Sequence, residues 1–165
     1  MVVGPKPFIR RAAPGEHDLL ATLAVRAWNV AVHGIELTEE RRFALKEKFL
    51  RHLSENADGV LVAELADGIR GWGGRVPDSP YISDLWVEPE YHGQGIGGHI
   101  LDALMAAIFL DGFAAALIGT HADNIPAIRL YEKMGFEVEW RGEEWSESLG
   151  CKVMKVGMRA SFEFR

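Results

Sequence analysis

Four glycines stand among the six residues from Gly93 to Gly98, between a predicted strand and a predicted helix. Glycine lets the backbone adopt positive φ and lets a ligand approach closely. The free amides at a helix N-terminus attract phosphate groups. The segment therefore predicts a cradle for a phosphate-bearing ligand. The alternative, a flexible surface turn, explains a pair of glycines better than it explains four at such a junction.

Two nucleotide-binding motifs overlap this segment. The spacing G-x-G-x-x-G from Gly93 to Gly98 matches the dinucleotide fingerprint, and Asp123 lies 25 positions later, near where a ribose-binding acid is sought. That fingerprint should open a series of alternating strands and helices, which the chain around it does not provide. An NAD(P)-binding oxidoreductase is therefore the second hypothesis. An NTP-binding loop is disfavoured, because His99 and Ile100 replace the Lys and Ser or Thr that it needs.

Hydrophobic periodicity and turn signals predict the elements that must position these residues. The expected strands cover residues 8–12, 60–65, 69–76, 81–87, 114–119, 136–140 and 151–158, and the expected helices cover 16–32, about 38–53, 100–110 and 125–134. Regular alternation in the strand 81–87 would place Tyr81, Ser83, Leu85 and Val87 on one face and Ile82, Asp84 and Trp86 on the other.

Composition restricts the class of protein. The 165 residues suit one domain, and the net charge of -6 argues against binding to nucleic acid or anionic lipid. Neither a signal peptide nor a membrane-spanning segment is predicted. Cys151 is the single cysteine, which favours a reducing, cytoplasmic compartment, and we expect it to be a small buried residue. The histidines lack the spacing of metal ligands, so no metal site is expected.

Two segments, 85–97 and 124–136, together resemble the signature segments of the GNAT superfamily of N-acetyltransferases. The order of the predicted elements from Phe8 to Met158 resembles that fold as well. The resemblance implies an α/β (α+β) fold with a mixed, mostly antiparallel central sheet flanked by helices. It also implies a parallel strand pair splayed at the acyl-CoA site, and one domain over residues 1–165.

The resemblance further implies acetyl-CoA as co-substrate and transfer of its acetyl group to a primary amine by direct attack in a ternary complex. Residues 85–87 would bond the pantetheine arm through their backbone, and the glycine turn would hold the pyrophosphate. His92 departs from the family pattern, which has Gln or Arg there. The cofactor contacts implied are Leu85, Trp86, Val87, His92, Gly93, Gln94, Gly95, Ile96, Gly97, Gly98 and Asn124.

Candidate catalytic groups follow from the same segments. Asn124 and Tyr131 lie seven positions apart, so both can face one groove; Asn124 would also cap the helix, and Tyr131 would be the general acid. Asp84 lies just before the presumed thioester contact and could act as base directly or through water. A hydrogen-bonded structural carboxylate is an equally good interpretation of Asp84. Gly119 occupies the place where some family members carry a Glu base.

The acceptor is left open by the sequence: a polyamine, an amino acid, an antibiotic-like amine or a protein amine all fit. By resemblance, the acceptor groove would include Trp28, His33, Trp72, Trp140 and Trp145. An acidic run could attract a cationic acceptor or simply form a solvated loop; it comprises Glu139, Glu143, Glu144 and Glu147. A noncatalytic acyl-CoA-binding sensor is a third hypothesis, and a homodimer is left open.

Overall fold

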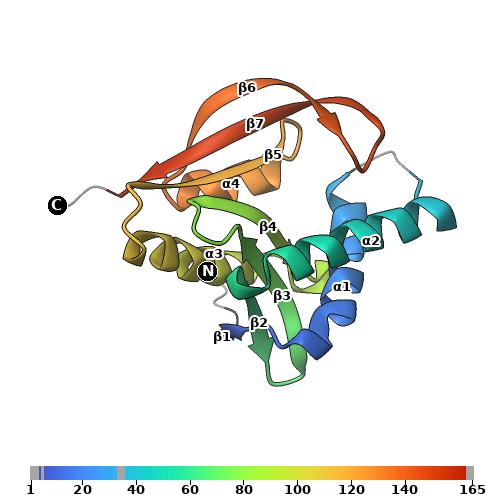
Figure 1. The fold of residues 1–165 in the computed structure, drawn as a ribbon, viewed down its shortest axis with the longest axis horizontal. Helices are drawn as coiled ribbons and strands as arrows, with labels where there is room; N and C mark the ends of the chain where they lie inside the picture. Colours follow the sequence, from blue (N-terminus) through green and yellow to red (C-terminus); the bar gives the residue numbers. More distant parts are fainter. Residues whose placement is uncertain (1–3, 5, 33–35, 163–165) are drawn as a thin grey trace.

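One mixed sheet of seven strands organises the chain (Figure 1). The computed structural model describes residues 4, 6–32 and 36–162. The strands, in sheet order, are β1 (Phe8–Arg11), β2 (Val60–Leu65), β3 (Gly68–Arg75), β4 (Tyr81–Val87), β5 (Ala115–His121), β7 (Cys151–Ser161) and β6 (Glu137–Ser146). The helices are α1 (His17–Ala31), α2 (Glu39–Glu55), α3 (Ile96–Leu110) and α4 (Ile125–Lys133), with short 3-10 turns η1 (Pro14–Glu16), η2 (Ala57–Gly59) and η3 (Pro89–Tyr91).

The pairing of β4 with β5 is parallel, whereas the other neighbouring strands pair antiparallel. The parallel ladder is short: it joins Tyr81 to Leu117 and Ile82 to Ile118. Both strands continue beyond it, β4 to Val87 and β5 to His121, without further pairing to each other. The predicted mixed sheet with one splayed parallel pair is therefore confirmed.

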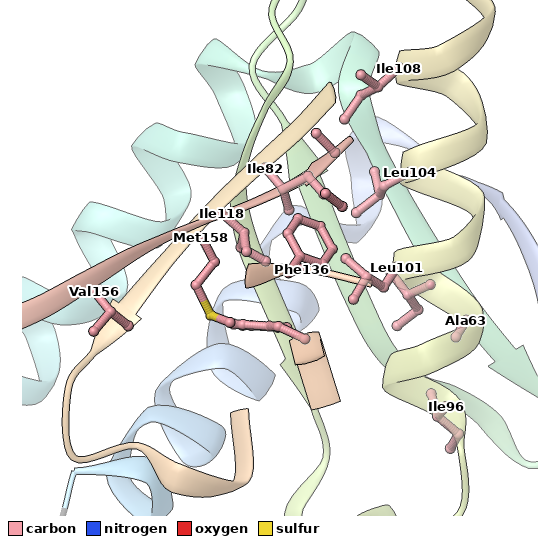
Figure 2. Packing of buried hydrophobic residues seen from close by; sticks show 14 of the residues in the cluster. Ala63, Ile82, Ile96, Leu101, Leu104, Ile108, Ile118, Phe136, Val156 and Met158 are labelled. Atoms are coloured by element: carbon pink, nitrogen blue, oxygen red, sulfur yellow. The ribbon is translucent and has the colours of Figure 1, made fainter. Parts of the chain in front are cut away.

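Two apolar clusters lie on opposite faces of the sheet. On one face α1 and α2 pack against Val60, Val62 and Trp72. On the other face α3 contributes an apolar stripe that meets residues of β4, β5 and β7, as Figure 2 shows. The labelled members of that cluster are Ala63, Ile82, Ile96, Leu101, Leu104, Ile108, Ile118, Phe136, Val156 and Met158. Helices on both faces thus hold β4 and β5 rigidly at the centre.

Helix ends are fixed by local side-chain and glycine chemistry. The Thr38 hydroxyl accepts a hydrogen bond from the Arg41 amide at 3.1 Å, which caps α2. The Asn124 side-chain oxygen accepts from the Ala127 amide at 3.4 Å, so the predicted cap of α4 is confirmed. After α4, Gly135 has φ of 100°, the left-handed conformation expected past a helix C-terminus.

A β-bulge at Ser83 interrupts β4. Gly74 pairs with Asp84 but the next residue, Arg75, pairs with Ile82, so Ser83 is an extra residue opposite β3. Such an insertion shifts the alternation of side chains by one position. The expectation of regular alternation through residues 81–87 was wrong for this reason.

The bulge decides which side chains of β4 face the two sides of the sheet. Ile82 and Leu85 both belong to the α3-side cluster. Ser83 and Trp86 both line a cavity on the α2 side. Each of these pairs is three positions apart, whereas regular alternation would separate its members onto opposite faces. The bulge thereby directs polar and indole groups into that cavity.

Several expected boundaries also differ. Helix α3 begins at Ile96 rather than at residue 100, and β6 extends to Ser146 rather than ending at residue 140. Cys151 is exposed, not buried, because it opens β7 opposite Ser146 at the tip of the β6–β7 hairpin, away from the core. Among the described residues no helix combines the length and apolar character that crossing a bilayer requires.

Candidate active site

The glycine turn joins η3 to α3, directly after β4. Gly93 has φ of 79° and Gly95, the N-cap of α3, has φ of 85°. A Cβ on either residue would meet nothing within 4 Å, so backbone conformation rather than crowding requires glycine at both positions. The first amides of an α-helix have no intrahelical partner. The turn therefore presents free amides and the positive end of α3 beside the end of β4.

The gap between the diverging ends of β4 and β5 exposes backbone groups of β4. The Glu88 amide donates to the Arg70 carbonyl at 2.8 Å, which directs residue 88 toward β3. Backbone groups alternate in direction along a strand, so those of Leu85 and Val87 point away from β3 into the gap. The β4–β5 ladder ends before them. An extended ligand lying in the gap would find the Leu85 backbone and the Val87 amide as hydrogen-bond partners, whereas the Val87 carbonyl already has a partner within the protein.

His92 anchors the glycine turn to the end of β4. Its Nε2 lies 2.9 Å from the carbonyl oxygen of Val87, so this nitrogen donates the hydrogen bond. The ring thus has a protein partner at one nitrogen, and the expected contact between His92 and a cofactor stays a prediction.

Asn124 and Tyr131, the candidates at the N-cap of α4 and within α4, both follow β5 in the chain. The Asn124 side-chain amide donates to the Thr120 hydroxyl at 3.3 Å, and Asn124 also lines the cavity described below. Tyr131 is 6% exposed and packs on Phe136, with ring centroids 6.0 Å apart. Burial raises the pKa of Tyr131, so its phenol is protonated at neutral pH. Tyr131 belongs to the α3-side cluster and does not line the cavity described below, so its role as general acid stays a prediction.

A cavity of about 510 Å³ opens on the face of the sheet that α1 and α2 cover, between these two helices and strands β4 to β7. The tip of the β6–β7 hairpin reaches α2 at its rim: Lys48 donates to the Ser148 hydroxyl at 2.8 Å, and Arg51 lies 3.1 Å from the Glu147 carboxylate. Figure 1 shows this hairpin arching over the sheet toward α2. Residues lining the cavity include Trp28, Lys48, His52, Tyr81, Trp86, His121, Trp140 and Lys155.

Only some of the residues expected in an acceptor groove line this cavity. Trp28 and Trp140 line the cavity. Trp72 does not, because it is fully buried in the core beneath α1 and α2, and Trp145 is 62% exposed on β6. His33 lies outside the described residues.

Charge in the cavity is mixed rather than uniformly acidic. Three of the four acidic candidates line it, whereas Glu143 does not; the three are Glu139, Glu144 and Glu147. Lys48 and Lys155 lie among them, and the Lys155 ammonium is 3.9 Å from the Glu144 carboxylate. Burial lowers the pKa of Lys48 and that of His121, so both hold a positive charge less readily than in water.

Asp84 accepts the hydrogen bonds of a buried cluster behind this cavity, whose lining includes its partners His52, Ser83 and Trp86. Its side chain is 3% exposed. One carboxylate oxygen lies 3.2 Å from Nδ1 of His52 and 3.0 Å from the Ser83 hydroxyl, and the other accepts from the Trp86 indole at 3.1 Å. In the described part of the chain, no three His, Cys, Asp or Glu side chains are grouped as a metal ion would require.

His52 was not among the residues predicted from the sequence. It is 32 positions from Asp84 and on another element, so no local spacing links the two residues. The available signal was its place on α2, where Phe49 and Leu53 are buried and His52 lies beside that apolar stripe. A polar residue next to a buried helix face often has a buried partner.

Comparison with known proteins identifies the group to which this site belongs. A family model described as "Acetyltransferase (GNAT) family" matches residues 20–136. A mycothiol acetyltransferase of Saccharomonospora viridis is 29% identical over 155 residues, covering 81% of this chain and 48% of that protein. A ribosomal protein bS18-alanine N-acetyltransferase of Escherichia coli is 34% identical over 61 residues, covering 37% of this chain and 41% of that protein. The chain spans less than half the length of these curated relatives.

Solved structures share the fold. A GCN5-related N-acetyltransferase from Rhodopseudomonas palustris superimposes with a TM-score of 0.80 at 22% identity, over 98% of this chain and 99% of that one. The PaiA N-acetyltransferase of Thermoplasma acidophilum, crystallised with coenzyme A, gives 0.73 at 19% identity, over 96% and 100% of the two chains. At this identity the likeness establishes the architecture, including the central mixed sheet.

Proposed function

This chain belongs to the acetyltransferase (GNAT) family, and from that premise we propose that it moves an acetyl group from acetyl-CoA to a primary amine by direct attack in a ternary complex. The observation that carries the proposal is the gap between β4 and β5. On one side of it lie the glycine turn and the free amides of α3, and on the other lies the 510 Å³ cavity. A donor and an acceptor can therefore meet in the gap from opposite sides.

We assign the donor to the α3 side. The amides from Gly93 to Gly98 would bind the pyrophosphate of acetyl-CoA, and the backbone of Leu85 and Val87 would bond the pantetheine arm. Both contacts use main-chain groups. A polyanionic ligand is therefore compatible with the net charge of -6.

The residues of the gap supply the polar groups that acetyl transfer needs. An alkylammonium has a pKa of ~10.4, so the acceptor must lose a proton before its nitrogen attacks the thioester carbon. The backbone amide of Leu85 or Val87 would stabilise the oxyanion of the tetrahedral intermediate. As the carbon–sulfur bond breaks, the Tyr131 phenol would protonate the departing thiolate. No covalent enzyme intermediate is required.

One comparison of ligands tests the proposed donor. Acetyl-CoA should raise the melting temperature, whereas NAD should leave it unchanged, because the sheet has one parallel pair and lacks the doubly wound parallel order of a dinucleotide-binding domain. Stabilisation by NAD alone would remove the proposal. Release of CoA thiol with an added amine then separates a transferase from a noncatalytic acyl-CoA sensor, which would bind without turnover.

The acceptor is proposed only as a class. The cavity is lined by the indole rings of Trp28, Trp86 and Trp140, and its carboxylates can attract an ammonium group. A thiol-release screen should include polyamines, amino acids, antibiotic-like amines and peptides with N-terminal alanine, the last because one relative is named for that activity. Mass analysis of the product would identify the acetylated nitrogen. The lone Cys151 supports a cytoplasmic location.

A further inference from the structure

We propose that His52 is the general base that takes the proton from the acceptor amine, and that Asp84 positions it. The inference rests on the proposed acetyl transfer and adds a residue on α2 to the reacting groups. His52 lines the cavity while its Nδ1 lies 3.2 Å from the Asp84 carboxylate. The two residues form a histidine–carboxylate pair in which the imidazole lines the cavity and the carboxylate is buried behind it.

The hydrogen-bond cluster sets the tautomer of the histidine. An ionised carboxylate only accepts hydrogen bonds, so Nδ1 of His52 must carry the proton in its bond to Asp84. The lone pair of the neutral ring is then on Nε2, the nitrogen left for the cavity. An imidazole in this tautomer can receive a proton at Nε2, and the carboxylate stabilises the imidazolium that results.

Asp84 itself is poorly placed to contact an amine. Its side chain is 3% exposed, and its two oxygens are occupied by His52, Ser83 and Trp86. The His52 side chain is 26% exposed and so reaches the cavity. The carboxylate is therefore a positioning residue, and the imidazole is the group that meets the acceptor.

The location of the pair suits the reaction. Asp84 directly precedes Leu85, whose backbone faces the gap in which the thioester would lie. Phe49, which is fully buried on α2, packs edge-on against the His52 ring with centroids 6.4 Å apart, and this contact limits rotation of the ring. The imidazole is thus held on the acceptor side of the strand that would hold the thioester.

Other titratable groups face the same space from every surrounding element except α1. Lys48 lies one helical turn before His52 on α2, and Tyr81 comes from β4. The remaining groups are His121 from β5, Glu139 and Glu144 from β6, Glu147 from the hairpin loop and Lys155 from β7. Lys48 is the rival base, since burial lowers its pKa, but its ammonium is bonded to Ser148 at the cavity rim.

The ammonium nitrogen gives one proton to Nε2 of His52, its freed electron pair forms the bond to the acetyl carbon, and the carbon–sulfur bond breaks. The thiolate takes its proton from Tyr131. The nitrogen, now bonded to the acetyl carbon, loses its second proton to solvent, so the product is a neutral amide. The imidazolium then releases its proton to solvent and the phenolate takes one up, which leaves one proton released for each acetyl group transferred.

The test is the pH dependence of kcat, measured at saturating acetyl-CoA with the best acceptor from the screen. Wild-type protein should lose activity as pH falls through the interval of about 5 to 8, where imidazoles titrate. His52→Gln should lower kcat by ~10²–10⁴-fold and abolish this acid limb, with the Kd for acetyl-CoA unchanged. His17→Gln, a substitution at the start of α1 away from the cavity, is the matched control and should behave as wild type.

Asp84→Asn tests the positioning role with little change of shape. The new amide would donate to Nδ1 and move the ring proton to Nε2, so kcat should fall by a comparable factor while the KM for acetyl-CoA stays unchanged. His52→Ala should regain turnover when imidazole is added. Should His52→Gln fold poorly, these two variants carry the test.

The outcomes are distinguishable. Turnover by His52→Gln at the wild-type rate with the wild-type pH profile would overturn the base while leaving acetyl transfer intact. If Lys48→Gln lost the fall in kcat at low pH while His52→Gln kept it, Lys48 would be the base and the proposal for His52 would be overturned. A wild-type protein that binds acetyl-CoA but acetylates no amine would overturn the proposed function and, with it, the base.

Discussion

Helix α3 lies against the sheet at Gly73 of β3, and this contact sets the position of the glycine turn. A Cβ added to Gly73 would lie 2.7 Å from Cγ2 of Ile100 and 2.8 Å from Cδ1 of Leu104. Carbon atoms pack best at about 3.5–4.0 Å, so Gly73→Ala should push the helix outward by roughly 1 Å. Cγ2 of Ile100 belongs to a β-branched side chain with restricted rotation, so the helix backbone must move.

The magnitude follows from two opposing effects. Overpacking of a well-packed core costs about 1–3 kcal/mol, and the reduced entropy of the unfolded alanine chain offsets about 0.4–1 kcal/mol. The expected net loss is about 1–2 kcal/mol of unfolding free energy. For a chain of this size, that loss corresponds to a decrease in Tm of roughly 2–8 °C. Affinity for acetyl-CoA should fall as well, because the N-terminus of α3 moves with the helix.

Thermal and urea unfolding would measure the effect, with Gly15→Ala as the matched control. A Cβ on Gly15 would meet nothing within 4 Å, and its backbone is not left-handed, so this variant should stay within about 0.5 kcal/mol of wild type. If Gly73→Ala melts together with wild type and Gly15→Ala, the missing side chain does not set the distance between α3 and the sheet.

Three further predictions concern the turn, the acid and an ion pair. The Gly95→Ala variant has room for its methyl group but forces alanine to a φ of 85°, so the free energy of unfolding should fall by about 1–2 kcal/mol. Calorimetry should also show weaker binding of acetyl-CoA, because the backbone of the glycine turn is strained. Unchanged binding would contradict a role of this turn in holding the pyrophosphate. Tyr131→Phe should lower the rate of thiol release by ~10²-fold or more while the Kd for acetyl-CoA stays constant, and unchanged turnover would end the acid role. Hydrogen bonds from Arg10 lower the pKa of Glu16 to about 2 from 4.5, so its contribution to stability is complete above pH 4.5 and lost as pH falls toward 2. Glu16→Gln should therefore flatten Tm against pH in that window, and a slope equal to wild type would disprove the assignment.

Local signals in the sequence predicted most of the helices and strands, the glycine turn and the cap of α4. The glycines from Gly93 to Gly98 located the turn that leads into α3, although the helix begins four residues earlier than expected, at Ile96. Asn124 located the start of α4, because asparagine is a preferred N-cap residue. The Asp67-Gly68 turn likewise located the β2–β3 hairpin. Each of these signals acts within a few residues of the structure that it predicts.

Features that depend on contacts between distant elements were not predictable in this way. Ser83 suits either face of a strand, so nothing in its type indicates the bulge that redirects β4. The bond between His52 and Asp84 forms only once α2 is packed on the sheet. Cys151 was expected to be buried from its residue type, but its place at a hairpin tip exposes it.

A crystal structure of the protein with acetyl-CoA would show directly where the donor binds. We expect pyrophosphate oxygens within hydrogen-bond distance of amides between Gly93 and Gly98, and the pantetheine arm beside Leu85 and Val87 in the β4–β5 gap. Acetyl-CoA bound elsewhere, with that gap and the glycine turn vacant, would contradict it.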